Sequence, residues 1–414
     1  MNGRKLQTAL ATIALSACAT GTAQAPSPAR LTPVTALVSG SPSDVWMKSD
    51  LGTTVDSVMK AGLANRAAPG GAVAIGRYGR LVVLKGYGFQ DTTGRSPAVD
   101  ENTMYDMASL TKVVATTTSA MILEEQGKLD LDRTVASYLP EFNAPDKAGI
   151  TMRMLITHRG GLEAFAALYK GFKGREQYLA AINSRPVKYE PGTKMIYSDW
   201  DMILTQLVIE RITGETLDRF VTEKVFAPLG MTSTMYTPDS ATYFSRIAPT
   251  ELDTISGGLK RGLVHGKVHD ENASAIGGVS GHAGLFSTAH DVAIFCQMLL
   301  NGGEYNGVRI LKSSTIAEWT TVQSRLSSRA LGWDTPERGS SSGHYFSSRS
   351  FGHTGFTGTS IWVDPERSLF VILLTNRVYP TRDNPRVGPL RRAVADAAQQ
   401  SIIDAPLINW EAGR

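Results

Sequence analysis

Ser109-Leu110-Thr111-Lys112 is the stretch around which the chain is organised. A polar segment precedes this stretch, and residues 112–126, which are typical of a long helix, follow it. Side chains three positions apart in a helix lie on one face, so the Ser109 hydroxyl and the Lys112 amine are predicted to be neighbours. Such a pair suits an activated nucleophile. The amine can take the serine proton if its pKa is lowered, and the positive end of the helix favours a developing oxyanion.

The first residues have the pattern of an export signal. Two positive residues, Arg4 and Lys5, precede a mostly apolar run over residues 6–17. That run is too short to span a bilayer and is typical of a cleaved signal peptide. We therefore predict a lipoprotein signal peptide at residues 1–17, which takes no part in the fold.

The cleavage site is predicted from Leu15-Ser16-Ala17-Cys18, which resembles a lipobox, the signal for attaching lipid to a cysteine. An ordinary secretory cut after Ala25 is the alternative, but Pro26 directly follows that position and disfavours it. We therefore predict an exported, periplasmic bacterial lipoprotein that is anchored to the membrane only through lipid on Cys18. Ala19 stands in place of the aspartate of inner-membrane retention, which favours the outer membrane if the cell is Gram-negative.

Composition sets limits on the rest of the chain. The 414 residues carry a formal charge of +4 without a run of Lys or Arg, so we predict no nucleic-acid partner. A flexible tether is expected over residues 18–49. The rest of the chain is long enough for one large domain or two and has enough apolar residues for a large core. Cys18 and Cys296 are the only cysteines. If Cys18 carries lipid, Cys296 has no disulfide partner, and its apolar surroundings predict a buried thiol.

The order of predicted elements suggests how the domain is built. Helices are expected at residues 51–65, 112–126, 151–162, 201–213, 217–229, 289–300 and 388–402. Strands are expected as a hairpin over residues 71–88 and as an antiparallel pair over residues 351–363 and 369–375. This order predicts an α+β fold, in which both chain ends build an antiparallel sheet flanked by helices and the helical middle forms a second lobe.

Two further motifs join Ser109-Leu-Thr-Lys112. Tyr197-Ser198-Asp199 lies in the middle of the chain, and His353-Thr354-Gly355 opens a late strand. This order resembles the serine β-lactamase and penicillin-binding-protein superfamily, in the branch of class C β-lactamases, D-Ala-D-Ala carboxypeptidases and family VIII esterases. The resemblance covers about residues 50–400 and includes the stretches Met154–Leu162, Gly281–Thr288 and Leu373–Arg377.

The resemblance implies a single catalytic domain of the serine β-lactamase/DD-peptidase fold over residues 50–405, with an acyl-transfer site. Ser109 would attack a carbonyl group and form an acyl-enzyme, while Lys112 and Tyr197 share the proton transfers. The backbone N–H groups of Ser109 and Phe356 would form the oxyanion hole. Asp199 would lie near Lys112 and hold it, or accept a hydrogen bond from the substrate.

Substrate recognition is assigned by the same resemblance to residues around the last motif. Thr354, beside Gly355, would bind a substrate carboxylate through its hydroxyl, and His353 and Arg377 would supply positive character. The chemistry needs neither a metal ion nor a cofactor, and we predict none.

At two positions the chain departs from the class C β-lactamases. Asp199 stands where they have asparagine, and His353 stands where they have lysine. A carboxylate in place of an amide and a mostly neutral imidazole in place of a fixed cation both weaken recognition of an anionic β-lactam. The expected function is therefore hydrolysis of D-Ala-D-Ala cell-wall peptides, with peptidoglycan stem peptides or other small acyl compounds as substrates. The alternatives are a family VIII-like carboxylesterase, a weak class C-like β-lactamase and a silent binder of cell-wall peptides.

Other patterns have simpler explanations. Gly339-Ser-Ser-Ser-Gly343 matches the nucleophile elbow of α/β-hydrolases, but its serine-rich flanks predict a loop. His265 and His269, followed by Asp270, have metal-ligand spacing for a helix, yet the glycines around them favour a loop. His282 lies among glycines and is a candidate for the lining of a substrate pocket.

Overall fold

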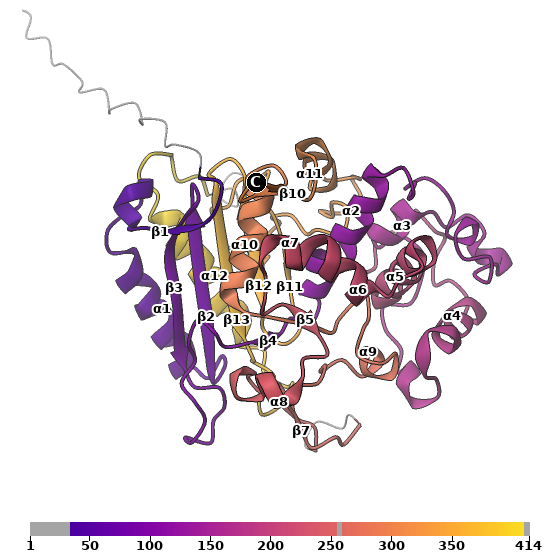
Figure 1. Cartoon of the computed structure of the whole chain (residues 1–414), viewed down its shortest axis with the longest axis horizontal. Helices are drawn as coiled ribbons and strands as arrows, with labels where there is room; N and C mark the ends of the chain where they lie inside the picture. The colour runs from indigo at the N-terminus through magenta and orange to yellow at the C-terminus, as the bar shows by residue number, and fades with distance from the viewer. Residues whose placement is uncertain (1–33, 255–258, 410–414) are drawn as a thin grey trace, which may run out of the picture. The chain divides into compact units, whose positions relative to one another are not determined.

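A six-stranded sheet carries the fold in the computed structural model, which describes residues 34–254 and 259–409 (Figure 1). The strand order is β1-β3-β2-β13-β12-β11; β1 pairs parallel with β3, and every other pair is antiparallel. The strands are β1 (Val38–Ser39), β2 (Gly70–Arg77), β3 (Arg80–Gly88), β11 (Phe351–Thr354), β12 (Ser360–Asp364) and β13 (Leu369–Thr375). Because β2 pairs with β13, both ends of the chain build the sheet, which confirms the predicted arrangement.

The hairpin of β2 and β3 shows why these residues form strands. Tyr78 and Gly79 both have positive φ, 49° and 78°, which is the turn geometry that matches the twist of paired strands. Along β2 the side chains alternate between the two faces. Ala72 and Ala74 belong to the main hydrophobic core, while Val73 is fully buried in between them. Such burial on both faces requires helices on each side.

Helices cover both faces of the sheet (Figure 1). On one face, α1 (Leu51–Ala64) and α12 (Val387–Gln400) pack together so closely that a Cβ on Gly62 would lie 2.5 Å from Leu390 Cδ1. On the main-core face, α10 (Ala289–Leu300) packs against β2 and β13. These three helices were all predicted from their apolar spacing.

The middle of the chain supplies a helical region that shares the main core with the sheet. Its helices are α2 (Thr118–Glu125), α3 (Met152–Ile156), α4 (Gly174–Ser184), α5 (Asp199–Thr213), α6 (Leu217–Val221), α7 (Ala227–Leu229), α8 (Ser240–Tyr243), α9 (Glu271–Ala275) and α11 (Ser313–Trp319). Two π-helical segments, Lys112–Thr117 and Thr222–Phe226, extend α2 and join α6 to α7.

Small sheets complete the framework. Three strands, β4 (Tyr105–Asp106), β8 (Leu285–Ser287) and β5 (Met235–Tyr236), pair in that order. Two further pairs are β6 (Glu251–Leu252) with β7 (Leu263–Val264) and β9 (Glu304–Tyr305) with β10 (Val308–Arg309). Among the described residues, none of the helices has the length and apolar character needed to cross a bilayer.

The structure corrects three predicted boundaries. Residues 34–49, assigned to the tether, include β1 and a 3-10 helix at Pro42–Val45, so ordered structure begins before residue 50. Residues 351–363 form two strands instead of one, because Gly358 at φ 114° allows a turn within them. Helix α3 ends at Ile156, ahead of the double glycine.

Three further predictions concern the signal peptide with Cys18, the Cys296 thiol and the loop at residues 339–343. The signal peptide and Cys18 lie outside the described residues. Cys296 is a fully buried free thiol whose pKa is raised by burial, as predicted. Residues 339–343 form turns without a preceding strand or a following helix, which confirms the loop and excludes a nucleophile elbow there.

The turn between β11 and β12 is tied to the segment before α2. The Thr357 hydroxyl donates a hydrogen bond to the Asp106 carbonyl at 2.7 Å, and the Thr359 hydroxyl donates to the Met107 carbonyl at 3.0 Å. Gly355 approaches this segment so closely that a Cβ there would lie 2.5 Å from the Met107 oxygen. Two parts of the chain that are far apart in sequence are thereby held in one place.

Replacing Gly355 with alanine should lower the free energy of unfolding by about 1–3 kcal/mol, because the new methyl group would collide with Thr359 Oγ1 and the Met107 carbonyl. Denaturant unfolding measures the change. Gly52→Ala in α1 is the matched control, since nothing lies within 4 Å of a Cβ there. Alanine is favoured over glycine inside a helix, so the control should keep or gain stability. Equal stability of the two variants would contradict the proposed tie.

Candidate active site

Ser109 lies directly before the helix that begins at Leu110, as predicted. The preceding residue, Ala108, has φ 46°, a left-handed conformation that costs energy for a residue with a Cβ. Its N–H donates a hydrogen bond to Asp106 Oδ1 at 2.8 Å, which holds this turn. The strained turn therefore fixes Ser109 at the start of the helix.

Lys112 lies one turn further on, and its side chain is fully buried. Its Nζ donates hydrogen bonds to Ser109 Oγ at 2.9 Å, to Asp199 Oδ1 at 2.7 Å and to the His282 carbonyl at 3.1 Å. Burial acts to lower the Lys112 pKa, but the charges of Asp199 and Tyr197 and the hydrogen bonds to them together outweigh burial, and the pKa is raised. The condition under which Lys112 would take the serine proton, a lowered pKa, is therefore not met. The geometry shows Lys112 as a hydrogen-bond donor to Ser109.

Tyr197 lies near two cations. Lys112 Nζ is 4.9 Å from the centroid of its ring, and the guanidinium carbon of Arg329 is 5.1 Å from it. The Tyr197 side chain lines the same space as Ser109, so Tyr197 is a candidate to exchange a proton with it. No sequence motif marks Arg329, and it is absent from the predicted site.

Two histidine rings lie beside Tyr197, tilted from its ring plane by 45° for His158 and 35° for His353. The ring centroids of His158 and His353 lie 4.5 Å and 5.8 Å from that of Tyr197. Burial, and then the charges of Arg329 and Lys112, hold the pKa of both histidines well below the usual value. His353 is therefore neutral and does not supply the positive character that the resemblance assigned to it.

The Ser109 and Phe356 backbone N–H groups are available for an oxyanion. Within the described part of the chain, neither N–H donates a hydrogen bond to another residue. Arg377 donates from Nε to the Phe356 carbonyl at 2.7 Å and from Nη1 to the Asn384 carbonyl at 2.7 Å. Arg377 thus positions the backbone around Phe356 through hydrogen bonds. The resemblance assigned to it only a positive charge.

Ser109, Tyr197 and Phe356 lie where two hollows meet. The first, which we call the basic hollow, has a volume of about 600 Å³. It also contains His353, Thr354, Gly355, Arg329, Arg377 and Arg391, and none of the described residues that line it is acidic. The three predicted residues of the last motif therefore face the same space as three arginines, of which only Arg377 was predicted.

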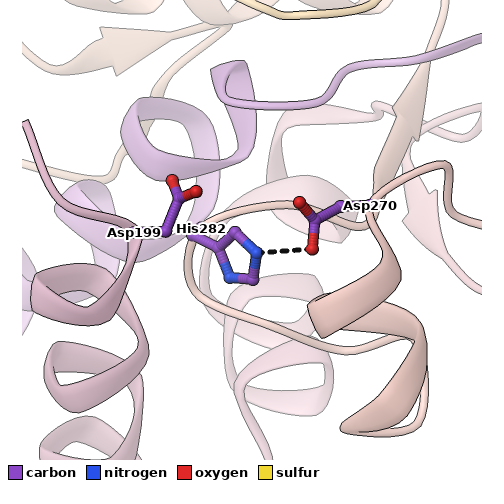
Figure 2. A group of neighbouring side chains, drawn as sticks. All are labelled: Asp199, Asp270 and His282. Carbon is purple, nitrogen blue, oxygen red and sulfur yellow. Dashed lines mark hydrogen bonds and ion pairs between the residues drawn. The ribbon is translucent and has the colours of Figure 1, made fainter. Parts of the chain in front are cut away.

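The second, which we call the acidic hollow, has a volume of about 330 Å³. Asp199, Asp270 and His282 line it, and Figure 2 shows these three side chains as neighbours. His282 Nε2 donates a hydrogen bond to Asp270 Oδ1 at 2.8 Å, and its Nδ1 lies 2.8 Å from Ser280 Oγ. The expectation that His282 lines a pocket beside the nucleophile agrees with this geometry.

The same three side chains have a donor set that a metal ion could use, since their ligand atoms lie within 4.8 Å of one another. However, Asp199 is already bonded to the Lys112 ammonium and His282 to Asp270. A divalent ion would have to displace or deprotonate Lys112, because like charges at this distance repel. The donor set is therefore poorly suited to a metal ion.

The histidines with metal-ligand spacing do not come together. His265 Nε2 bonds to the Ile247 carbonyl at 2.6 Å, whereas His269 Nε2 bonds to Glu251 Oε2 at 2.8 Å. Each ring is held by its own structural partner.

Comparisons with known proteins agree with this geometry. The family model described as Beta-lactamase matches residues 55–396. A chain from Escherichia coli K12, named as a candidate D-alanyl-D-alanine carboxypeptidase, is 36% identical over 317 residues, which cover 69% of this chain and 72% of that one. A class C β-lactamase structure is similar with a TM-score of 0.68 at 18% identity, over 87% of this chain and 98% of that one. A family VIII carboxylesterase has a TM-score of 0.64 at 21% identity, over 85% and 98% of the two chains.

Replacing Asp199 with asparagine should lower the Lys112 pKa, because it removes the charge that raises it. If the Lys112 ammonium is needed, kcat/KM for an activated ester should begin to fall at a lower alkaline pH in the variant than in the wild type. The measurement is the pH dependence of kcat/KM. Asp132→Asn is the control, since Asp132 also forms an ion pair, with Arg153, but is 73% exposed. An alkaline limb that stays in place in Asp199→Asn would show that the charge on Lys112 is not required.

Proposed function

Since the chain belongs to the β-lactamase family and is a serine hydrolase of that fold, we propose that it acts as a D-Ala-D-Ala carboxypeptidase on cell-wall peptides. The observation that carries the proposal is the basic hollow beside Ser109, which contains three arginines and no acidic side chain among its described residues. A carboxypeptidase must recognise the free carboxylate of the residue that it removes. The name of the 36% identical relative agrees with this activity.

The basic hollow has groups suited to a carboxylate. Arg329 Nη1 is buried and has no hydrogen-bond partner in the described part of the structure. Guanidinium groups bind carboxylates through short, charge-assisted hydrogen bonds. The Thr354 hydroxyl lines the same space and can donate one more. A substrate without a carboxylate would leave the buried Arg329 Nη1 unsatisfied.

Acylation would begin from the phenolate form of Tyr197, whose oxygen takes the Ser109 hydroxyl proton and becomes a neutral phenol. The Ser109 oxygen then forms a bond to the scissile carbonyl carbon, and the N–H groups of Ser109 and Phe356 stabilise the negative carbonyl oxygen. The bond to the leaving amine breaks as Tyr197 returns the proton to its nitrogen. Lys112 remains an ammonium throughout, and its hydrogen bond orients the Ser109 oxygen.

Hydrolysis would repeat these steps with water. Tyr197 takes a proton from the water molecule as its oxygen attacks the ester carbon on Ser109. The ester bond breaks, and the proton passes to the Ser109 oxygen, which restores the free enzyme.

We also propose, from the sequence pattern alone, that the chain is exported and anchored through lipid on Cys18. Peptidoglycan stem peptides would then be accessible to it in the periplasm.

The proposal predicts release of D-alanine from a peptide that ends in D-Ala-D-Ala, and at least about tenfold slower cleavage when the terminal carboxylate is an amide. Arg329→Met should bring the acid-to-amide ratio of kcat/KM close to one, whereas Arg338→Met, outside both hollows, should leave it unchanged. Ser109→Ala should abolish both reactions. Rapid hydrolysis of short-chain esters without any D-alanine release would instead identify a carboxylesterase.

A further inference from the structure

The turn between β11 and β12 carries a backbone N–H that is available for an oxyanion, and an arginine of α12 is bound to both ends of this turn. Arg391 Nη2 donates hydrogen bonds to the Gly355 carbonyl at 2.6 Å and to the Thr359 carbonyl at 2.9 Å. Gly355 and Thr359 are also bonded to each other, because the Gly355 N–H donates to the Thr359 carbonyl at 2.8 Å. Arg391 therefore bridges the turn that contains Phe356.

The bond from Arg391 to Gly355 acts on the oxyanion donor itself. The Gly355 carbonyl and the Phe356 N–H belong to one planar peptide group, which is trans, so they point in opposite directions. A cation bound to the oxygen polarises the peptide and makes its N–H a stronger donor. A hydrogen bond from a guanidinium group is also stronger than one between neutral groups. Arg391 thus holds and polarises the peptide group that faces the nucleophile.

The other carbonyl groups of the turn are bound as well. Arg377 donates to the Phe356 carbonyl from Nε at 2.7 Å and to the Thr357 carbonyl from its backbone N–H at 2.8 Å. The Thr375 hydroxyl donates to the Gly358 carbonyl at 3.1 Å. The Phe356 N–H, by contrast, donates to no other residue in the described part of the chain. Because its carbonyl groups are held, the turn keeps this N–H in one orientation.

Arg391 is costly to place at this position. Its Nε is buried and has no hydrogen-bond partner among the described residues, so the guanidinium group is only partly satisfied. Burial, and then the charge of Arg377, lowers the Arg391 pKa to about 9, which still leaves a cation at neutral pH. Replacing buried charges with apolar side chains of similar size is often neutral or stabilising. The cation is therefore better explained by its effect on the site than by stability.

Resting on the oxyanion hole of the proposed function, we propose that Arg391 is a positioning residue for acylation that acts through the Gly355–Phe356 peptide group. The negative oxygen that this peptide binds develops only in the transition state, so Arg391 should affect the acylation rate and hardly affect the binding of the substrate. Neither the sequence motifs nor the family resemblance assigns this residue a role.

Arg391→Met tests the proposal with p-nitrophenyl acetate, which has no carboxylate that Arg391 could bind directly. Methionine is apolar and flexible, and it removes both the charge and the N–H groups. Single-turnover kinetics with enzyme in excess give the acylation rate constant and the substrate Kd. The rate constant should fall about tenfold or more, while Kd changes less than about twofold.

A boronic acid gives a second readout. Methylboronic acid forms a tetrahedral, negatively charged adduct with the Ser109 oxygen and places one boron-bound oxygen in the oxyanion hole. Its affinity, measured by inhibition, should fall in Arg391→Met by a factor similar to that of the rate constant. A merely structural loss would instead lower the fraction of folded enzyme without changing either value.

Arg392→Met is the matched control, because Arg392 is the next residue of α12 and lines neither hollow. It should keep the wild-type rate constant and boronic acid affinity. Arg391→Lys is a second variant, which keeps the charge on a shorter side chain without the guanidinium fork. Its rate constant should fall at least about threefold and lie above that of Arg391→Met.

The outcomes are distinct. An unchanged acylation rate constant in Arg391→Met overturns the proposal, and if that variant does not fold, an unchanged rate constant in Arg391→Lys overturns it. A loss confined to peptides with a free terminal carboxylate would make Arg391 a substrate contact and would also overturn it. If Ser109→Ala meanwhile abolishes hydrolysis, the serine hydrolase stands and only this inference fails; hydrolysis that persists in Ser109→Ala overturns the proposed function itself.

Discussion

The buried Lys112 ammonium is the charge on which the rest of the site depends. Removing an ammonium group from water costs several kcal/mol unless the protein supplies partners. Lys112 finds three, on the turn before its own helix, at the start of α5 and in the loop before β8. Three distant parts of the chain must therefore meet around one nitrogen. The same contacts that satisfy the charge also place the Ser109 oxygen.

In the proposed mechanism Tyr197, and not Lys112, takes the Ser109 proton. An ammonium group cannot accept a proton, but Lys112 and Arg329 both place positive charge near the Tyr197 ring. His158 and His353 are kept neutral by burial and by these same cations, so they pack against the ring without adding charge. The electrostatics of the site are thus set by Lys112, Arg329 and Asp199.

The sheet contributes the other half of the site. Hydrogen bonds from Thr357 and Thr359 to the segment before Ser109 bring the β11–β12 turn next to the nucleophile. This contact places Phe356 and Thr354 in the lining of the basic hollow, together with Ser109.

Much of this arrangement could be predicted from sequence, because it rests on short motifs in a fixed order. The strands and helices around the sheet follow from apolar spacing, and Ser109, Lys112, Tyr197 and Asp199 meet as their motifs imply. The raised Lys112 pKa could not be predicted, because the motifs place Asp199 near Lys112 but do not show whether its partners together outweigh the effect of burial. Arg329 and Asp270 belong to no motif, and only the folded chain brings them to the nucleophile. Residues 351–363 form two strands because Gly358 has a positive φ. The β-rich sequence pattern does not indicate this glycine conformation.

The most direct measurement is intact mass of the protein after incubation with a fluorophosphonate, which reacts with activated serines whatever their substrate. We expect one adduct, located on Ser109 by peptide mass, absent in Ser109→Ala and formed much more slowly in Tyr197→Phe. An adduct on another residue, or an adduct rate that Tyr197→Phe leaves unchanged, would contradict a Ser109 nucleophile activated by Tyr197.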